Sequence, residues 1–127
     1  MDHWAVPYIG EPWSQQRHCW EFFREIQQKH FRRDIPVVDV DVLNMRAVSR
    51  EFTSNPERQR WLEVDVPREG DGVLMTRVKY PWHVGVWVEV DGGRVLHCDQ
   101  HAGVLCQSLA SLRLHGWHSL QWFHPCF

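Results

Sequence analysis

The stretch HVGVWVEVDGGRVLHCD, residues 83–99, decides the fold because it holds two short apolar segments separated by turn residues. Its arms, 83–90 and 94–99, are rich in Val and Leu, which favour strands. The Asp-Gly-Gly between the arms is typical of a tight connection. The stretch therefore predicts an antiparallel β-hairpin.

The length of the hairpin loop decides which side chains share a face. A three-residue loop at 90–92 would set His97 opposite Gly85, on the same face as His83 and ~7 Å along the strand from it. A two-residue loop of the two glycines would turn His97 to the other face. A three-residue loop centred one residue later would favour Asp99 as the partner of the first histidine.

The rest of the chain predicts an α+β protein with helices first and a sheet second. Residues 1–18 read as an irregular segment with turns. The less polar positions between 19 and 30 recur with helical spacing, and a second helix is expected within 44–61, stopped by Ser-Asn-Pro. Further strands are expected at 61–67 and 72–78, separated by turns at 68–72 and 79–82.

Length and composition exclude several classes of protein. With 127 residues, the chain is expected to form one domain spanning 1–127. Lys and Arg total 14 against 16 Asp and Glu, so no nucleic-acid partner is expected, and no apolar run is long enough to cross a membrane. Four cysteines without a recognisable secretory signal predict free thiols made in a reducing compartment.

Cys19 is the candidate nucleophile because it begins the first predicted helix. Unpaired amides and the helix dipole favour negative charge at that position, so we expect a lowered pKa for the thiol. Working as a nucleophile also requires a base. His83 opens a predicted strand and can project from the sheet rim, and His97 would orient its imidazole. His18, beside the nucleophile, is a candidate cation.

Several motifs in this order resemble the NlpC family of bacterial cell-wall cysteine peptidases. The matching segments are YIGEPW (8–13), HCW (18–20), PREGDGVLM (67–75), HVGVWV (83–88) and RVLHCD (94–99). The ending GWHSLQWFHP (116–125) is most similar to the branch found in phage and prophage tail proteins. Two segments depart from the family pattern. His18 replaces a usual Asp, and WSQQR replaces a glycine-rich segment.

The resemblance implies a papain-like NlpC fold, with N-terminal helices packed on a small antiparallel sheet. It implies hydrolysis of peptidoglycan stem peptides at a γ-D-glutamyl bond to a diamino acid, without metal or organic cofactor. Cys19 would be the nucleophile, His83 the base and His97 the orienting residue. The oxyanion would be met by the Cys19 amide and Tyr8.

The resemblance also suggests surroundings for the site and a location for the protein. Trp13 and Trp82 are the candidate walls of a substrate groove. The expected location is a phage tail after synthesis in the bacterial cytoplasm, and other tail proteins are candidate partners.

Other readings of the same residues stay open. Cys19 alone could be an inert buried thiol. A zinc site could use His97, Cys98, His101 and Cys106, although this spacing fits no usual pattern and neighbouring strand residues face opposite ways. The chain could also be a catalytically silent tail scaffold, an amidase effector or an acyltransferase.

Overall fold

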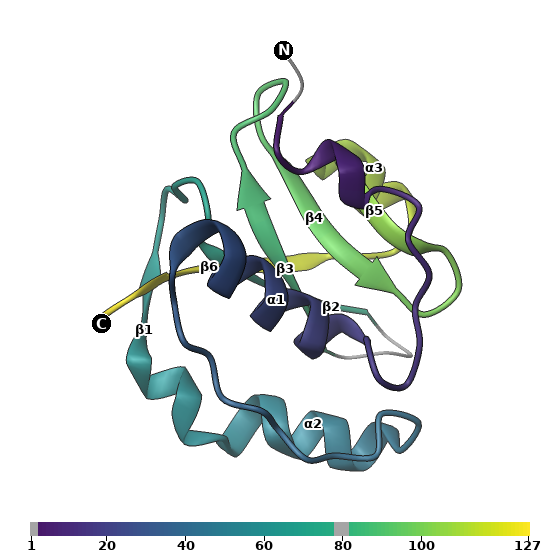
Figure 1. Ribbon diagram of the computed structural model, residues 1–127, viewed down its shortest axis with the longest axis vertical. Coiled ribbons are helices and arrows are strands. Elements are labelled where there is room, and N and C mark those ends of the chain that lie inside the picture. The colour runs from purple at the N-terminus through teal and green to yellow at the C-terminus, as the bar shows by residue number, and fades with distance from the viewer. Residues whose placement is uncertain (1–2, 78–81) are drawn as a thin grey trace.

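The structure is a computed structural model that describes residues 3–77 and 82–127, apart from the side chain of Met45. Within these residues it has a six-stranded antiparallel sheet and three α-helices, which confirms the α+β class (Figure 1). The turn expected at 79–82 falls mostly outside the described residues. No helix in the described part is long and apolar enough to cross a bilayer.

The helical elements are the 3-10 helices η1 (Val6–Tyr8) and η2 (Pro56–Arg60) and the α-helices α1 (Cys19–Phe31), α2 (Met45–Ser54) and α3 (Leu109–Leu114). The strands are β1 (Trp61–Val64), β2 (Gly72–Thr76), β3 (His83–Val88), β4 (Arg94–Asp99), β5 (Gly103–Gln107) and β6 (Ser119–Pro125). The sheet order is β1-β6-β2-β3-β4-β5. Both helices expected in the first half are confirmed.

Three elements of the second half were not predicted from the sequence. They are β5, α3 and β6. The β6 segment SLQWFHP shows no clear alternation of apolar and polar residues, and it forms a strand because it pairs with both β1 and β2. The helix α3 lies between two strands, so the expected order of helices first and sheet second holds only for the first half.

The β3–β4 hairpin has the register predicted for a three-residue loop at 90–92. Val88 pairs with Arg94 and Val86 with Leu96, so His97 lies opposite Gly85. The connection is longer than expected, since five residues, 89–93, lie between the end of β3 at Val88 and the start of β4 at Arg94. The register keeps both histidines on one face of the sheet.

The helix α1 covers one face of the sheet (Figure 1). Its Phe22, Phe23 and Ile26 are buried against sheet residues that include Val84 and Val86. Each of these three side chains contributes about 1.5–3 kcal/mol by leaving water. These three residues have the helical spacing that the sequence predicts. Because they all face the sheet, they fix the orientation of α1 and the direction in which its first residue faces.

The opposite face of the sheet carries a second apolar cluster around Trp87, Val95, Leu112 and Trp117. Because strand side chains alternate, His83 and His97 point to this second face, whereas Val84 and Cys98 point to the α1 face. A functional contact between α1 and the histidines is therefore expected at the start of β3, where His83 is the first residue.

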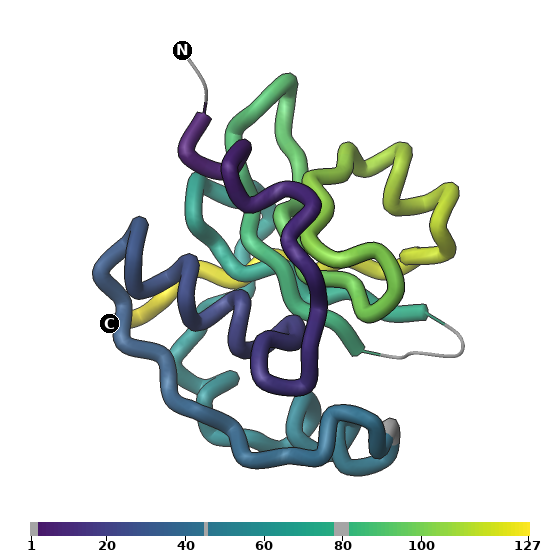
Figure 2. The backbone as a smooth tube through the Cα atoms, turned by 45° about the vertical axis from the view of Figure 1, so that its right-hand side comes forward, coloured from purple at the N-terminus to yellow at the C-terminus, as the bar shows by residue number. Residues whose placement is uncertain are grey.

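The segment before α1 runs along β5 and closes that edge of the sheet (Figure 2). The Gly10 amide donates to the Val104 carbonyl at 2.9 Å, and the Val104 amide donates to the Glu11 carbonyl at 2.8 Å. A side chain at Gly103 would meet the Glu11 carbonyl oxygen at 2.4 Å, so this close approach requires glycine.

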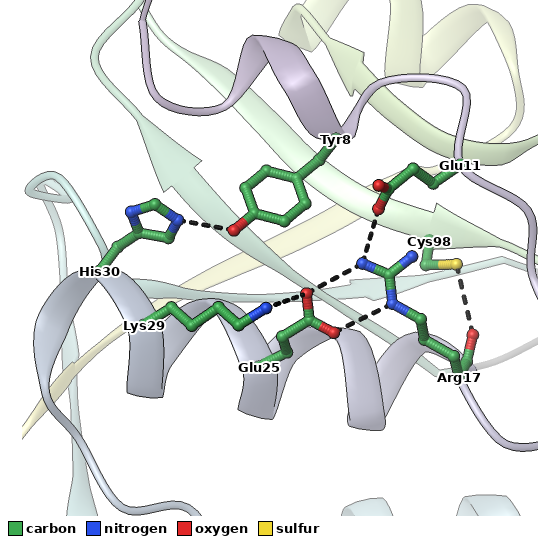
Figure 3. Close-up of polar contacts among 7 residues, drawn as sticks. All are labelled: Tyr8, Glu11, Arg17, Glu25, Lys29, His30 and Cys98. Atoms are coloured by element: carbon green, nitrogen blue, oxygen red, sulfur yellow. Dashed lines mark hydrogen bonds and ion pairs between the residues drawn. The ribbon is translucent and has the colours of Figure 1, made fainter.

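Arg17 fixes the final turn before α1. Its Nη2 lies 2.7 Å from Glu11 Oε1 and 3.0 Å from Glu25 Oε2 (Figure 3). One arginine thus ties the preceding segment to the body of the helix. These two ion pairs limit where Cys19, two residues later, can lie.

An extended strap, residues 36–42, leads from α1 to α2 and runs beside α2 (Figure 1). Val38, Val40 and Val42 are half-buried, whereas Asp39 and Asp41 are exposed. This alternation is that of a strand with one apolar face, although the strap forms no strand ladder. The three valines instead line the cavity described next.

Candidate active site

A cavity of about 190 Å³ lies between the start of α1, the start of β3 and the strap. Cys19 and His83 both line it, together with Trp13, Trp82 and Asp99. Most of the remaining wall is apolar and comes from Val38, Val40, Val42, Val48, Phe52, Trp20, Phe23, Trp61 and Phe123. The sequence-predicted nucleophile and base therefore open onto one space.

Cys19 occupies the first position of α1, as predicted, with His18 at the N-cap. The His18 side chain makes no capping hydrogen bond, so it does not occupy the first amides of the helix. The residue is partly exposed.

The pKa of Cys19 does not follow the sequence-based expectation. Burial raises the pKa of this thiol to about 11, and the nearby backbone amides of Val84, Trp20 and Cys19 itself oppose that rise only in part. The helix start therefore supplies donors near the sulfur without producing a resting thiolate. The expected cation is missing too, because burial lowers the pKa of His18 and favours its neutral form.

The two histidines form the contact that the hairpin register predicts. His83 Nε2 lies 2.8 Å from His97 Nδ1, and the two rings meet edge to face. His97 Nε2 lies 2.7 Å from Gln107 Oε1 on β5. All three residues are buried. The contacts form a continuous chain from β3 through β4 to β5.

Both imidazoles are held in the neutral form. Burial keeps the pKa of His83 well below its ordinary value, and His97 and Arg77 act in the same direction. Burial also lowers the pKa of His97 to about 4, although its hydrogen bond to Gln107 Oε1 acts in the opposite direction. At pH 7 the cavity is therefore lined by a residue with a neutral thiol, Cys19, and by one with a neutral imidazole, His83.

Trp117 packs against the ring face of His83. Its indole stacks on the imidazole with ring centroids 5.0 Å apart and an angle of 16° between the planes. The guanidinium carbon of Arg77 lies over the Trp117 ring, 3.9 Å from its centroid. Trp117 is only 2% exposed, so it limits the positions that the His83 ring can adopt.

Asp99 is not the partner of His83. Its Oδ2 accepts hydrogen bonds from the backbone amides of His101 at 3.0 Å and Ala102 at 2.9 Å. This carboxylate stabilises the turn between β4 and β5. The hairpin register thus selects His97 over Asp99 as the neighbour of the first histidine.

Tyr8 does not lie at the candidate site, contrary to the expectation from the resemblance. Its hydroxyl is 2.8 Å from Nε2 of His30, near the far end of α1 (Figure 3). Cys19 and His30 are eleven residues apart on this helix, which corresponds to ~16 Å. Tyr8 is absent from the cavity wall, and its ring packs against Trp4 and Phe22. It therefore stabilises the fold rather than an oxyanion.

Trp82 and Trp13 both lie in the cavity wall. Trp82 stacks on Phe52 of α2 with ring centroids 6.2 Å apart. This contact joins the end of the β2–β3 connection to the helix that follows the strap. Asp71, read from the sequence as a turn residue, accepts the Arg68 amide at 2.8 Å.

The residues of the alternative zinc site do not lie together. His97 and Cys98 point to opposite faces of the sheet, and the Cys98 thiol is directed at the Arg17 carbonyl, 3.7 Å away (Figure 3). Among the described residues there is no group of three or more His, Cys, Asp or Glu side chains placed to hold a metal ion. All four cysteines are free thiols.

Sequence reasoning missed Gln107 and Trp117. Gln107 lies on a strand that was not predicted, and Trp117 is one of eight tryptophans that composition cannot distinguish. In the register of β5 on β4, Leu105 lies opposite His97, and Gln107 is two residues further along β5 on the same face. Knowledge of this register would have placed Gln107 near His97.

Comparison with known proteins adds no assignment. No protein-family model matches the chain, and no curated protein matches it either. The resemblance noted above rests on the motifs alone.

Proposed function

We propose that this protein is a papain-like cysteine hydrolase of the NlpC type that cleaves amide bonds in the peptide part of peptidoglycan. The observation that supports it is that Cys19, at the start of α1, and His83 line one cavity. The imidazole is backed by His97 through a 2.8 Å contact. Thiol-based acyl transfer requires such a set of groups: a nucleophile, a base and a residue that orients the base.

In the proposed reaction, the Cys19 thiol gives its proton to Nδ1 of His83 as sulfur attacks the substrate carbonyl carbon. The backbone amides at the start of α1 meet the negative charge that develops on the carbonyl oxygen. His83 then returns the proton to the leaving amine, the C–N bond breaks and a thioester remains. Water attacks the thioester with His83 as base, and the thiol is regenerated.

The assignment to wall peptides, and to a phage tail as the place of action, follows from the motif resemblance. The test is incubation with purified muropeptides, read by product masses. We expect cleavage by the parent and none by Cys19→Ala. Asp99→Asn is the matched control, because Asp99 lines the same cavity but supports a turn. Intact muropeptides with a folded parent protein would contradict the proposal.

One observation favours a second substrate class for the same chemistry. The cavity beside Cys19 is walled by valine and aromatic side chains, including Val38, Val40 and Val42 of the strap. Such a wall suits an apolar acyl group better than a charged stem peptide, because buried charge is costly. A series of 4-nitrophenyl esters of increasing chain length tests this candidate. Activity that rises with chain length, without muropeptide cleavage, would favour an acyl hydrolase or acyltransferase.

A further inference from the structure

The chain of contacts behind His83 continues beyond the two histidines. Gln107 Oε1 lies 2.7 Å from His97 Nε2, and Gln107 Nε2 lies 3.0 Å from Ser111 Oγ. Gln107 is 8% exposed and His97 is fully buried, so water does not compete for these contacts. The amide of Gln107 therefore decides which nitrogen of His97 carries the proton.

Two orientations of this amide have opposite consequences. With Oε1 facing His97, the oxygen accepts from Nε2–H, Nδ1 of His97 keeps its lone pair, and Nε2–H of His83 donates to it. The free lone pair of His83 is then at Nδ1. With the amide reversed, His97 carries its proton on Nδ1 and donates to His83 Nε2. The neutral His83 must then hold its proton on Nδ1, and this nitrogen therefore cannot accept the thiol proton.

His115 competes for the same amide. Its Nδ1 is 3.1 Å from Gln107 Nε2 and 2.8 Å from the Ser111 carbonyl oxygen. As an N–H donor to Ser111, His115 would face the Gln107 NH2 group donor to donor and would favour the reversed amide. As an acceptor from the Gln107 NH2 group, His115 favours the orientation in which Oε1 faces His97, and it then makes no hydrogen bond to the Ser111 carbonyl oxygen, which can only accept. The amide is thus set by its neighbours on α3 and at the C-terminal end of that helix.

We propose that Gln107 is a positioning residue that selects the tautomer of His97 and thereby leaves Nδ1 of His83 as the basic nitrogen of the site. This inference deepens the proposed function and rests on it for its catalytic consequence. The tautomer itself is a property of the folded protein and can be measured without any substrate.

Two substitutions separate positioning from packing. Gln107→Met keeps a similar shape but removes the acceptor, so His97 loses the partner that fixes its tautomer. Gln107→Glu offers an acceptor whichever oxygen faces His97, and it can also accept from Ser111 and His115. The charged and titratable groups near His97 are Asp99, Arg77, His115 and His83. Neither substitution alters any of them.

The first measurement is the ¹⁵N NMR spectrum of the histidine side chains in the full-length parent protein at pH 7. We expect unprotonated Nδ1 in both His83 and His97. A protonated Nδ1 in both residues would overturn the proposal, whatever the protein hydrolyses. We expect Gln107→Met to shift these signals toward the protonated Nδ1 form, and Gln107→Glu to retain the parent pattern.

The second measurement is hydrolysis of the substrate that the parent cleaves. We expect Gln107→Met to lower kcat roughly 10- to 100-fold at an unchanged KM, as displacement of a reacting group does. Gln107→Glu should restore kcat and move the acid limb of the pH profile to higher pH, since its charge favours protonated imidazole. Equal losses in both variants, with parent-like histidine signals, would assign Gln107 to packing. If the parent cleaves nothing, the proposed function fails while the NMR result still decides the tautomer.

Discussion

Nε2 of His83 and Nδ1 of His97 lie 2.8 Å apart on adjacent strands, inside a part of the sheet where both residues are buried. This contact uses one nitrogen of each ring. It leaves Nδ1 of His83 outside this contact, and His83 and Cys19 line the same cavity. The hairpin register therefore brings the two histidines together as a candidate base and orienting residue.

Cys19 should react slowly with thiol reagents in the free protein. Its pKa of about 11 leaves roughly one thiolate in ten thousand molecules at pH 7. We expect alkylation by iodoacetamide to speed up about tenfold per pH unit up to about pH 11, as measured by peptide mass spectrometry. Exposed Cys126 is the internal reference. Labelling of Cys19 at pH 7 as fast as that of Cys126 would indicate a resting thiolate paired with His83.

The protein should lose stability between about pH 6.5 and pH 4. The pKa of His97 is lowered to about 4, so between these values the unfolded chain binds a proton that the folded protein does not. The stabilisation is complete above pH 6.5 and falls by on the order of 3 kcal/mol as pH drops to about 4. His83, whose pKa is lowered too, adds in the same direction.

Urea unfolding of the parent and of His97→Gln at several pH values checks this expectation. The substituted protein should show a flatter dependence on pH, since it lacks one buried imidazole. An identical pH dependence in the two proteins would show that His97 does not carry the effect.

Gly85→Ala should disturb the pairing of β3 with β4. A Cβ at this position would lie 2.6 Å from Cγ1 of Val95 and 3.1 Å from Cβ of His97. We expect a loss of about 1–3 kcal/mol in the free energy of unfolding, together with reduced activity. Gly92→Ala is the control, because it adds backbone strain at φ +84° with no atom within 4 Å. Activity retained in Gly85→Ala and lost in the control would contradict the importance of this register.

Val40→Asp should weaken binding of an apolar group beside Cys19. Val40 lines the cavity, whereas Val37 on the same strap is 65% exposed. A carboxylate at the first position must be buried or must displace the strap, so we expect kcat/KM for apolar esters to fall about tenfold or more. Val37→Asp should behave as the parent. Equal activity of the two variants would mean that the strap does not contact the substrate.

The sequence by itself determined the α1 helix and the β3–β4 hairpin, and it named Cys19 and His83 as candidate residues. These depend on local spacing: apolar residues at helical intervals around Phe22 and Ile26, and turn residues between two apolar strands. The sequence left the choice between His97 and Asp99 open, because it depends on where the hairpin loop is centred, and the observed register brings His97 to His83.

Only the tertiary structure decided the rest, because it depends on groups brought together from distant parts of the chain. Tyr8 pairs with His30 rather than approaching Cys19. The thiol pKa is raised because the packed protein removes water from sulfur more effectively than the helix start compensates. Gln107 reaches His97 through pairing of β5 with β4, a long-range register that local spacing does not encode.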